Sequence, residues 1–188
     1  MTHLTRTFLN TCLALLLSIP VITLAQGMKP GMDHDMGAEM GANMADHMAI
    51  LQRMEDREAI EHLMWRYTRA LDSFDPDAYV AVFTEDGAFG NIKGRDALYK
   101  MIADLRDSRA KQAAEGNPAA PMYHATENYW TEFVSPTHAR HHAYWVTYFG
   151  ANGQDNPARM ISVGRSVDDL FKVNGQWLIQ TRDIAPQD

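Results

Sequence analysis

Four long segments in the C-terminal part of the chain are rich in aromatic and β-branched residues, a composition typical of β-strands. They cover residues 123–134, 140–149, 160–173 and 176–184. The dipeptide Asn174-Gly175 separates the last two and is a strong signal for a two-residue hairpin turn. The pattern predicts long antiparallel strands whose apolar face must be covered by other elements.

Helical patterns precede these strands. Residues 47–73 and residues 96–110 each carry an apolar stripe with helical spacing. Between them, Asp75 suits an N-cap and Pro76 a first helical position, which predicts a short helix ending near Phe83. We therefore expect an α+β fold with three N-terminal helices packed on one face of a curved sheet.

The segment between the second and third helices should contain a turn and a short strand. Residues 85–87 read Glu-Asp-Gly, a turn-forming sequence, and we expect a short strand near residues 88–92.

Residues 1–25 have the features of a secretory signal peptide. Arg6 provides the positive charge, and Leu24-Ala25 ends a short apolar stretch before the expected new N-terminus at Gln26. The stretch is about 12 residues long, whereas a membrane-spanning helix needs about 20. This predicts a periplasmic or secreted protein with no stable membrane insertion. Cys12, the single cysteine, would be removed with the signal.

Residues 26–46 differ in composition from the rest of the chain. A methionine recurs at every fourth position from Met28 to Met48, among several glycines and Pro30. Glycine and proline disfavour a stable helix, so we expect a flexible linker. Thioethers are soft ligands that suit Cu(I), and His34 and His47 add imidazoles, so copper handling is an alternative role for this tract.

Length and charge exclude several classes of protein. The 188 residues suit one domain of ordinary size. Acidic residues outnumber basic ones 24 to 17, for a net charge of −7. No basic cluster is interleaved with aromatic residues, so a nucleic-acid partner is not expected.

Several short motifs together resemble a known family. They are Arg66-Tyr67-x-x-Ala70-Leu71-Asp72, Phe83-Thr84-Glu85-Asp86-Gly87, His124-x-x-x-Asn128, Gly164-x-x-x-Asp168 and Gly175-x-Trp177-x-x-x-x-Arg182. In this order and spacing, residues 47–186 resemble SnoaL-like proteins of the nuclear transport factor 2-like superfamily. The resemblance implies a cone-shaped fold with a strongly curved, mainly antiparallel sheet around a single deep pocket. It also implies a homodimer or homotrimer.

The resemblance also implies four site residues. Asp72, His124 and Arg182 match functional positions of hexachlorocyclohexane dehydrochlorinase, a member of the superfamily. Tyr67 matches a tyrosine of bile-acid 7α-dehydratase, another member, whereas the dehydrochlorinase has a lysine there. Dehydration, the reaction type of scytalone dehydratase as well, is therefore better supported than loss of halide.

The four side chains suit elimination chemistry. The imidazole of His124 can accept a proton at neutral pH, and Asp72 can hold its tautomer. Tyr67 can donate a proton to a leaving hydroxyl, and Arg182 can stabilise an anionic group. The resulting hypothesis is a lyase without cofactor or metal, a dehydratase or isomerase. Its substrate would be a small apolar cyclic molecule such as a steroid, a terpenoid or an aromatic compound.

We expect other side chains to bind the substrate. They are Trp65, Tyr79, Phe83, Asn128, Trp130 and Trp145, with Phe89 as a further aromatic of the same set. Each of the site residues also has a purely structural interpretation as a helix cap, a core residue or a surface charge. A non-catalytic ligand-binding or accessory protein with the same pocket therefore remains an alternative.

Three histidines lie close together at residues 138–142. His141 and His142 are neighbours on a predicted strand, so their side chains point to opposite faces and cannot easily share one metal ion. We expect both of them, with His138, to be surface or interface residues.

Overall fold

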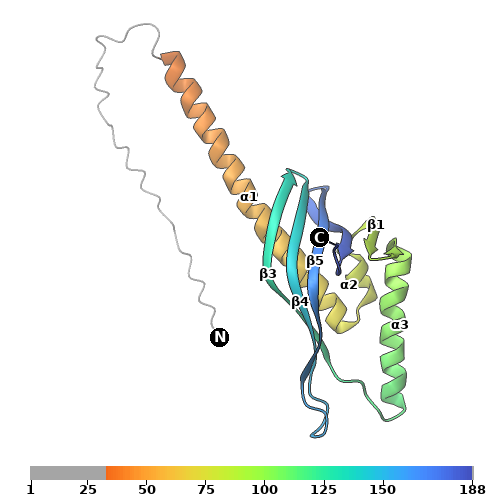
Figure 1. Ribbon diagram of the computed structural model, residues 1–188. Coiled ribbons are helices and arrows are strands. Elements are labelled where there is room, and N and C mark those ends of the chain that lie inside the picture. Colours follow the sequence, from red (N-terminus) through yellow and green to blue (C-terminus); the bar gives the residue numbers. More distant parts are fainter. Residues whose placement is uncertain (1–32, 188) are drawn as a thin grey trace, which may run out of the picture. The chain divides into compact units, whose positions relative to one another are not determined.

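The computed structural model describes residues 33–187 (Figure 1). The chain divides into two compact units, one ending at Met44 and the other beginning at Ala45. The predicted signal peptide and residues 26–32 of the predicted linker lie outside the described residues. Within the described part of the chain, no helix is both long and apolar enough to cross a membrane.

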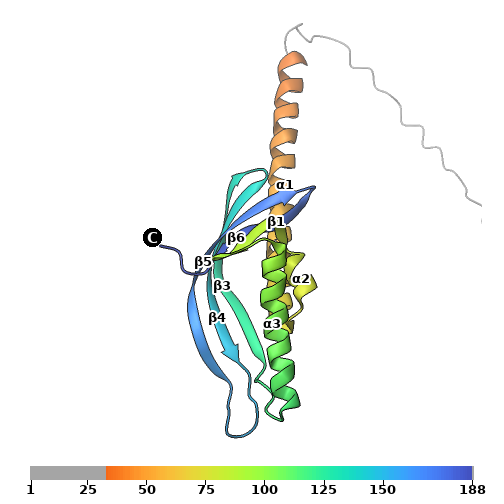
Figure 2. The same ribbon diagram turned by 90° about the vertical axis from the view of Figure 1, so that its right-hand side faces the viewer.

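Six strands form one sheet in the order β2-β1-β6-β5-β4-β3. The strands are β1 (Phe83–Phe89), β2 (Ile92–Lys93), β3 (Met122–Ser135), β4 (His138–Phe149), β5 (Arg159–Val173) and β6 (Gln176–Asp183). Neighbouring strands are antiparallel except for β1 and β6, which run parallel. The predicted α+β fold with a mainly antiparallel sheet is confirmed, and Figure 2 shows the curvature of the sheet beside the helices.

Two local predictions are confirmed in atomic detail. Asn174 and Gly175 have φ angles of 51° and 81°, the left-handed conformation that a tight β5–β6 hairpin requires. Asp75 caps the short helix α2 (Pro76–Val80), because its Oδ1 accepts a hydrogen bond of 3.0 Å from the backbone N–H of Ala78. A third helix, α3 (Arg95–Ala114), matches the second predicted apolar stripe.

The first helix begins earlier than predicted. Helix α1 spans Asp33–Ser73, so the prediction of a flexible linker is wrong for residues 33–46. Alanine and methionine, which occur three times each in residues 33–46, favour helix, and Gly37 and Gly41 each cost only about 1 kcal/mol relative to alanine. No proline lies between Asp33 and Ser73 to interrupt the backbone hydrogen bonds.

The buried part of α1 is shorter than its apolar pattern. Ile50 and Met54 are exposed, whereas Ile60, Leu63 and Tyr67 are buried in the core. A buried carboxylate marks the start of the covered part. Asp56 accepts hydrogen bonds of 2.9 Å from the Trp177 indole and 2.7 Å from the Lys172 ammonium, which tie α1 to the β5–β6 hairpin.

The predicted turn at residues 85–87 is wrong, because these residues lie inside β1. The pairing of β1 with β6 shifts register between Phe83 and Ala88. A Cβ at Gly87 would lie 2.9 Å from the Cβ of Phe83, so glycine is needed for a close approach. The turn-forming residues therefore make an irregular strand.

Candidate functional site

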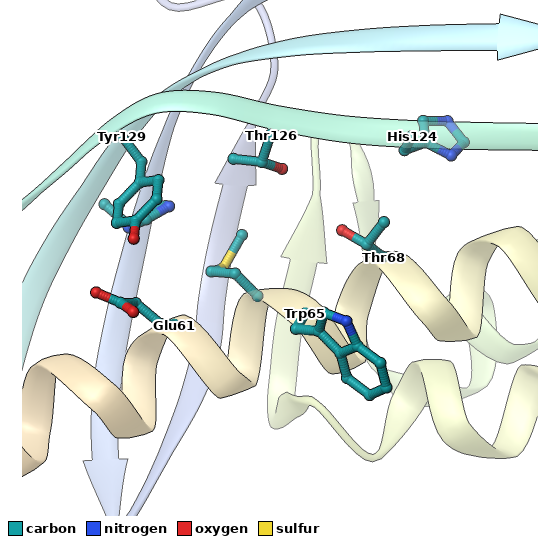
Figure 3. Close-up of a pocket in the computed structure, with 8 residues that line it drawn as sticks. Glu61, Trp65, Thr68, His124, Thr126 and Tyr129 are labelled. Carbon is teal, nitrogen blue, oxygen red and sulfur yellow. The ribbon is translucent and has the colours of Figure 1, made fainter.

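Two adjoining cavities lie between α1 and the sheet. The first, called here the Trp65 cavity, has a volume of about 270 Å³, and Figure 3 shows Thr68 of α1 pointing toward β3 across it. The second, the Arg182 cavity, has a volume of about 240 Å³. Thr68, His124 and Thr126 line both cavities, so the single pocket expected from the sequence has two compartments that meet at these residues.

A carboxylate–imidazole pair stands where the cavities meet. The Oδ1 atom of Asp72, near the end of α1, lies 2.7 Å from Nδ1 of His124 on β3. The same oxygen accepts a hydrogen bond of 3.1 Å from the backbone N–H of His124. The predicted approach of these two side chains is confirmed. Since the carboxylate engages Nδ1, Nε2 is the ring nitrogen left for a ligand in the cavity.

Tyr67 and Arg182 both line the Arg182 cavity. The guanidinium of Arg182 lies 4.4 Å from the centre of the Tyr67 ring. Burial raises the pKa of Tyr67 although the charge of Arg182 opposes this shift, so the phenol stays protonated and can act as a donor. The structure thus brings all four predicted site residues to one place.

Arg182 is held by a buried counter-ion. Asp168, on β5 opposite Arg182 of β6, is fully buried and forms an ion pair with its guanidinium. Burial raises the pKa of Asp168 to about 7, although the charge of Arg182 lowers it. The sequence motif contained Asp168 without indicating this role, which only the register of the two strands reveals.

The predicted aromatic lining is partly right. Trp65 lines the first cavity, and Trp145 and Phe89 line the second. Tyr79 and Phe83 do not line either cavity, because both are completely buried in the core with ring centres 5.1 Å apart. Their rings pack beneath Tyr67, so they support a site residue and have no face left for a ligand.

A β-bulge overturns two further predictions. Asn128 has a φ angle of 47°, and the pairing of β3 with β4 shifts between Glu127 and Trp130. The extra residue reverses the alternation of side chains, so Tyr129 lines the Trp65 cavity. Asn128 is exposed at the bulge, and Trp130 is 57% exposed with its ring 5.1 Å from that of His142. Neither side chain lines the two cavities.

The expectation that His141 is a surface or interface residue is also wrong. Its side chain is 1% exposed, lines the Trp65 cavity and has Nδ1 3.2 Å from the Thr131 hydroxyl. His142 points to the other face, near Glu132, as strand alternation requires. His138 contacts Asp169 at 2.8 Å. Sequence alternation separates His141 from His142 but cannot indicate which of them faces inward.

The buried imidazole of His141 should make the protein sensitive to acid. Burial lowers the pKa of His141 from 6.5 to about 4, with smaller effects from the charges of Arg182 and His142. At pH values between about 4 and 6.5, His141 is protonated in the unfolded chain but neutral in the folded protein. The free energy of unfolding therefore falls as the pH is lowered. We expect this residue to account for about 2 kcal/mol of lost stability between pH 6.5 and about pH 5.

Urea unfolding at the two pH values measures this effect. His141→Phe should remove that part of the pH dependence, and His142→Phe, on the outer face of the same strand, should retain it. An unchanged pH dependence in His141→Phe would show that another group is responsible.

The position of the Trp145 ring, which lines the Arg182 cavity, depends on the lack of a side chain at Gly164. A Cβ at Gly164 would lie 2.5 Å from Cζ2 of the Trp145 ring, and the indole N–H donates to the carbonyl of Arg165 at 3.0 Å. Gly164→Ala should therefore push the indole into the cavity and lower stability by about 1–3 kcal/mol. Thermal unfolding measures the loss. The matched control is Val163→Ala on the exposed side of β5, and equal stability of the two variants would contradict the prediction.

No cluster of three or more His, Cys, Asp or Glu side chains that could hold a metal ion is present among residues 33–187. The four predicted side chains can transfer protons and stabilise negative charge.

A family model for a SnoaL-like domain matches residues 52–183. A solved Mycobacterium tuberculosis protein of unknown function, Rv3472, is 26% identical over 69% of this chain and 74% of that chain, with a TM-score of 0.56. A candidate scytalone dehydratase from Novosphingobium aromaticivorans is 25% identical over 70% and 83%, with a TM-score of 0.54. A nuclear transport factor 2-like protein with a cystatin-like fold, from the same species, is 24% identical over 78% and 90%, with a TM-score of 0.58, which shows the fold alone. No curated protein matches the chain.

Proposed function

The chain belongs to the SnoaL-like domain family, and from this premise we propose that it is a cofactor-free lyase of the dehydratase type or a related isomerase. The observation that carries the proposal is the contact of 2.7 Å between Asp72 and His124 at the junction of two cavities. A paired carboxylate and imidazole inside a cavity can remove a proton from a bound carbon acid.

The reaction would need three roles. Nε2 of His124 takes a proton from a carbon next to a carbonyl or an aromatic ring, and Asp72 stabilises the resulting imidazolium. The electrons of the broken C–H bond form a C=C bond as the C–O bond breaks. The leaving hydroxyl takes a proton from Tyr67 and departs as water. Arg182 stabilises negative charge that develops on the substrate.

The cavity walls favour an apolar ring. Aromatic side chains face both compartments, from Trp65 in one and from Phe89 and Trp145 in the other. Volumes of about 270 and 240 Å³ suit a small cyclic molecule such as a terpenoid, a steroid or an aromatic compound. The similarity to a candidate scytalone dehydratase agrees with dehydration of such a molecule.

Turnover of cyclic β-hydroxyketones tests the proposal. The purified protein is incubated with a panel of these compounds, and the loss of water is followed by mass spectrometry and by the absorbance of the conjugated enone. Dehydration above the rate without protein supports the lyase. Compounds that bind tightly and are recovered unchanged would instead support a non-catalytic ligand-binding protein.

A further inference from the structure

The Trp65 cavity has a second polar end, away from the Asp72–His124 pair. Figure 3 shows Tyr129 and Glu61 at one end of this cavity and His124 at the other. His141 belongs to the Tyr129 end, because the centres of the two rings are 5.5 Å apart in a stacked arrangement. The proposed elimination uses none of these three side chains.

His141, which lines this cavity, carries a ring nitrogen that has no hydrogen-bond partner in the described part of the chain. Its Nδ1 is 3.2 Å from the Thr131 hydroxyl, whereas Nε2 is buried without a hydrogen-bond partner among residues 33–187. A buried polar atom without a partner is costly, and a side chain that is 1% exposed cannot turn to solvent for one. A ligand in the cavity that His141 lines can supply the missing hydrogen bond.

The neighbours of His141 limit the charge of that ligand. The negative charge of Glu61 raises the pKa of Tyr129, so the phenol stays protonated beside the carboxylate. Burial keeps the imidazole of His141 neutral at pH 7 by lowering its pKa to about 4. An anionic ligand group would be repelled by Glu61, and no lysine or arginine among residues 33–187 lines this cavity. An ammonium group would give up its hydration shell, and in return it would contact only the neutral imidazole of His141 and the exposed carboxylate of Glu61.

We propose that the Tyr129 end of the cavity is a subsite in which His141 binds a neutral hydroxyl group of the ligand. A hydroxyl can donate to Nε2 or accept from it, so it satisfies either tautomer that the Thr131 contact allows. The apolar body of the ligand then lies against Met64 and Trp65, with its other end at His124. The inference rests on the proposed function in placing the substrate in this cavity, and it defines the substrate as an apolar ring compound with a second hydroxyl remote from the reacting carbon.

Binding of matched naphthalene probes tests the subsite without turnover. Isothermal titration calorimetry compares 2-naphthol, 2,6-dihydroxynaphthalene, 6-hydroxy-2-naphthoic acid and 6-(aminomethyl)-2-naphthol. The diol should bind about 3- to 10-fold more tightly than 2-naphthol, the change expected for one added hydrogen bond. The acid and the amine should bind more weakly than the diol.

Two variants assign the effect to His141. His141→Phe keeps an aromatic ring for stacking on Tyr129 but has no nitrogen, so the preference for the diol should disappear. His142→Phe makes the same change on the opposite face of β4 and should keep the preference. Persistence of the preference in His141→Phe would overturn the assignment.

The wild-type comparison is decisive even where a variant fails to fold. Equal affinities for the diol and 2-naphthol, tighter binding of the acid or the amine, or no binding of any probe would overturn the subsite. Because these measurements need no catalysis, they separate the two proposals. If the protein dehydrates its substrates but shows no preference for the diol, only the proposed subsite is contradicted. If it prefers the diol but catalyses no dehydration, only the proposed catalytic function is contradicted.

Discussion

His124→Ala is expected to lower turnover about 100-fold or more while leaving the protein folded. The variant removes the group proposed to accept the proton, and the remaining side chains can only bind the substrate and stabilise charge. The His124 side chain is partly exposed in the cavity, so its loss should not disrupt the core. Steady-state kinetics gives the loss, and circular dichroism checks the fold.

A matched control is His138→Ala. His138 also contacts an aspartate at 2.8 Å, but it lines neither of the two cavities, and its removal should leave turnover unchanged. A chelator should likewise leave wild-type activity unchanged if the four side chains perform the reaction. Full activity of His124→Ala, or loss of activity with a chelator, would contradict the proposed mechanism.

Arg182→Met is expected to lower the free energy of unfolding by about 3–5 kcal/mol. Asp168 is fully buried and forms an ion pair with Arg182. The substitution removes this positive partner and leaves the carboxylate buried. Burial already raises the pKa of Asp168 to about 7, and loss of the positive charge of Arg182 should raise this pKa further in the folded state. The deficit of the variant should therefore be smaller at acidic pH and grow as the pH rises above neutrality.

Urea unfolding at several pH values measures this deficit. Replacing both partners, in Asp168→Leu with Arg182→Met, should restore part of the lost stability because no uncompensated charge remains buried. Lys100→Met, which breaks the exposed pair of Lys100 with Asp104, should have little effect. Wild-type stability of Arg182→Met at pH 8 would show that the buried pair contributes nothing to the fold.

Local sequence signals predicted most of the elements correctly. The Asn174-Gly175 turn and the Asp75 cap depend on the conformations and hydrogen bonds of a few neighbouring residues. The resemblance of scattered motifs to a family placed Asp72 near His124, although 52 positions separate them in the sequence. The predicted linker is wrong at residues 33–46, because the cost of two glycines in a helix is smaller than the helix preference of the residues around them.

The tertiary structure decided which side chains reach the cavities. Strand alternation is a rule of period two, so the single extra residue at Asn128 exchanges the sides of Tyr129 and Trp130 without changing the composition. Tyr79 and Phe83 have the same aromatic character as Trp145, but packing between α2 and β1 leaves them no open face. The sequence by itself determined the α+β class and the antiparallel C-terminal strands, through local conformational preferences and apolar periodicity. The identity of the inward-facing residues, His141 above all, followed only from register and packing, because both depend on residues far apart along the chain.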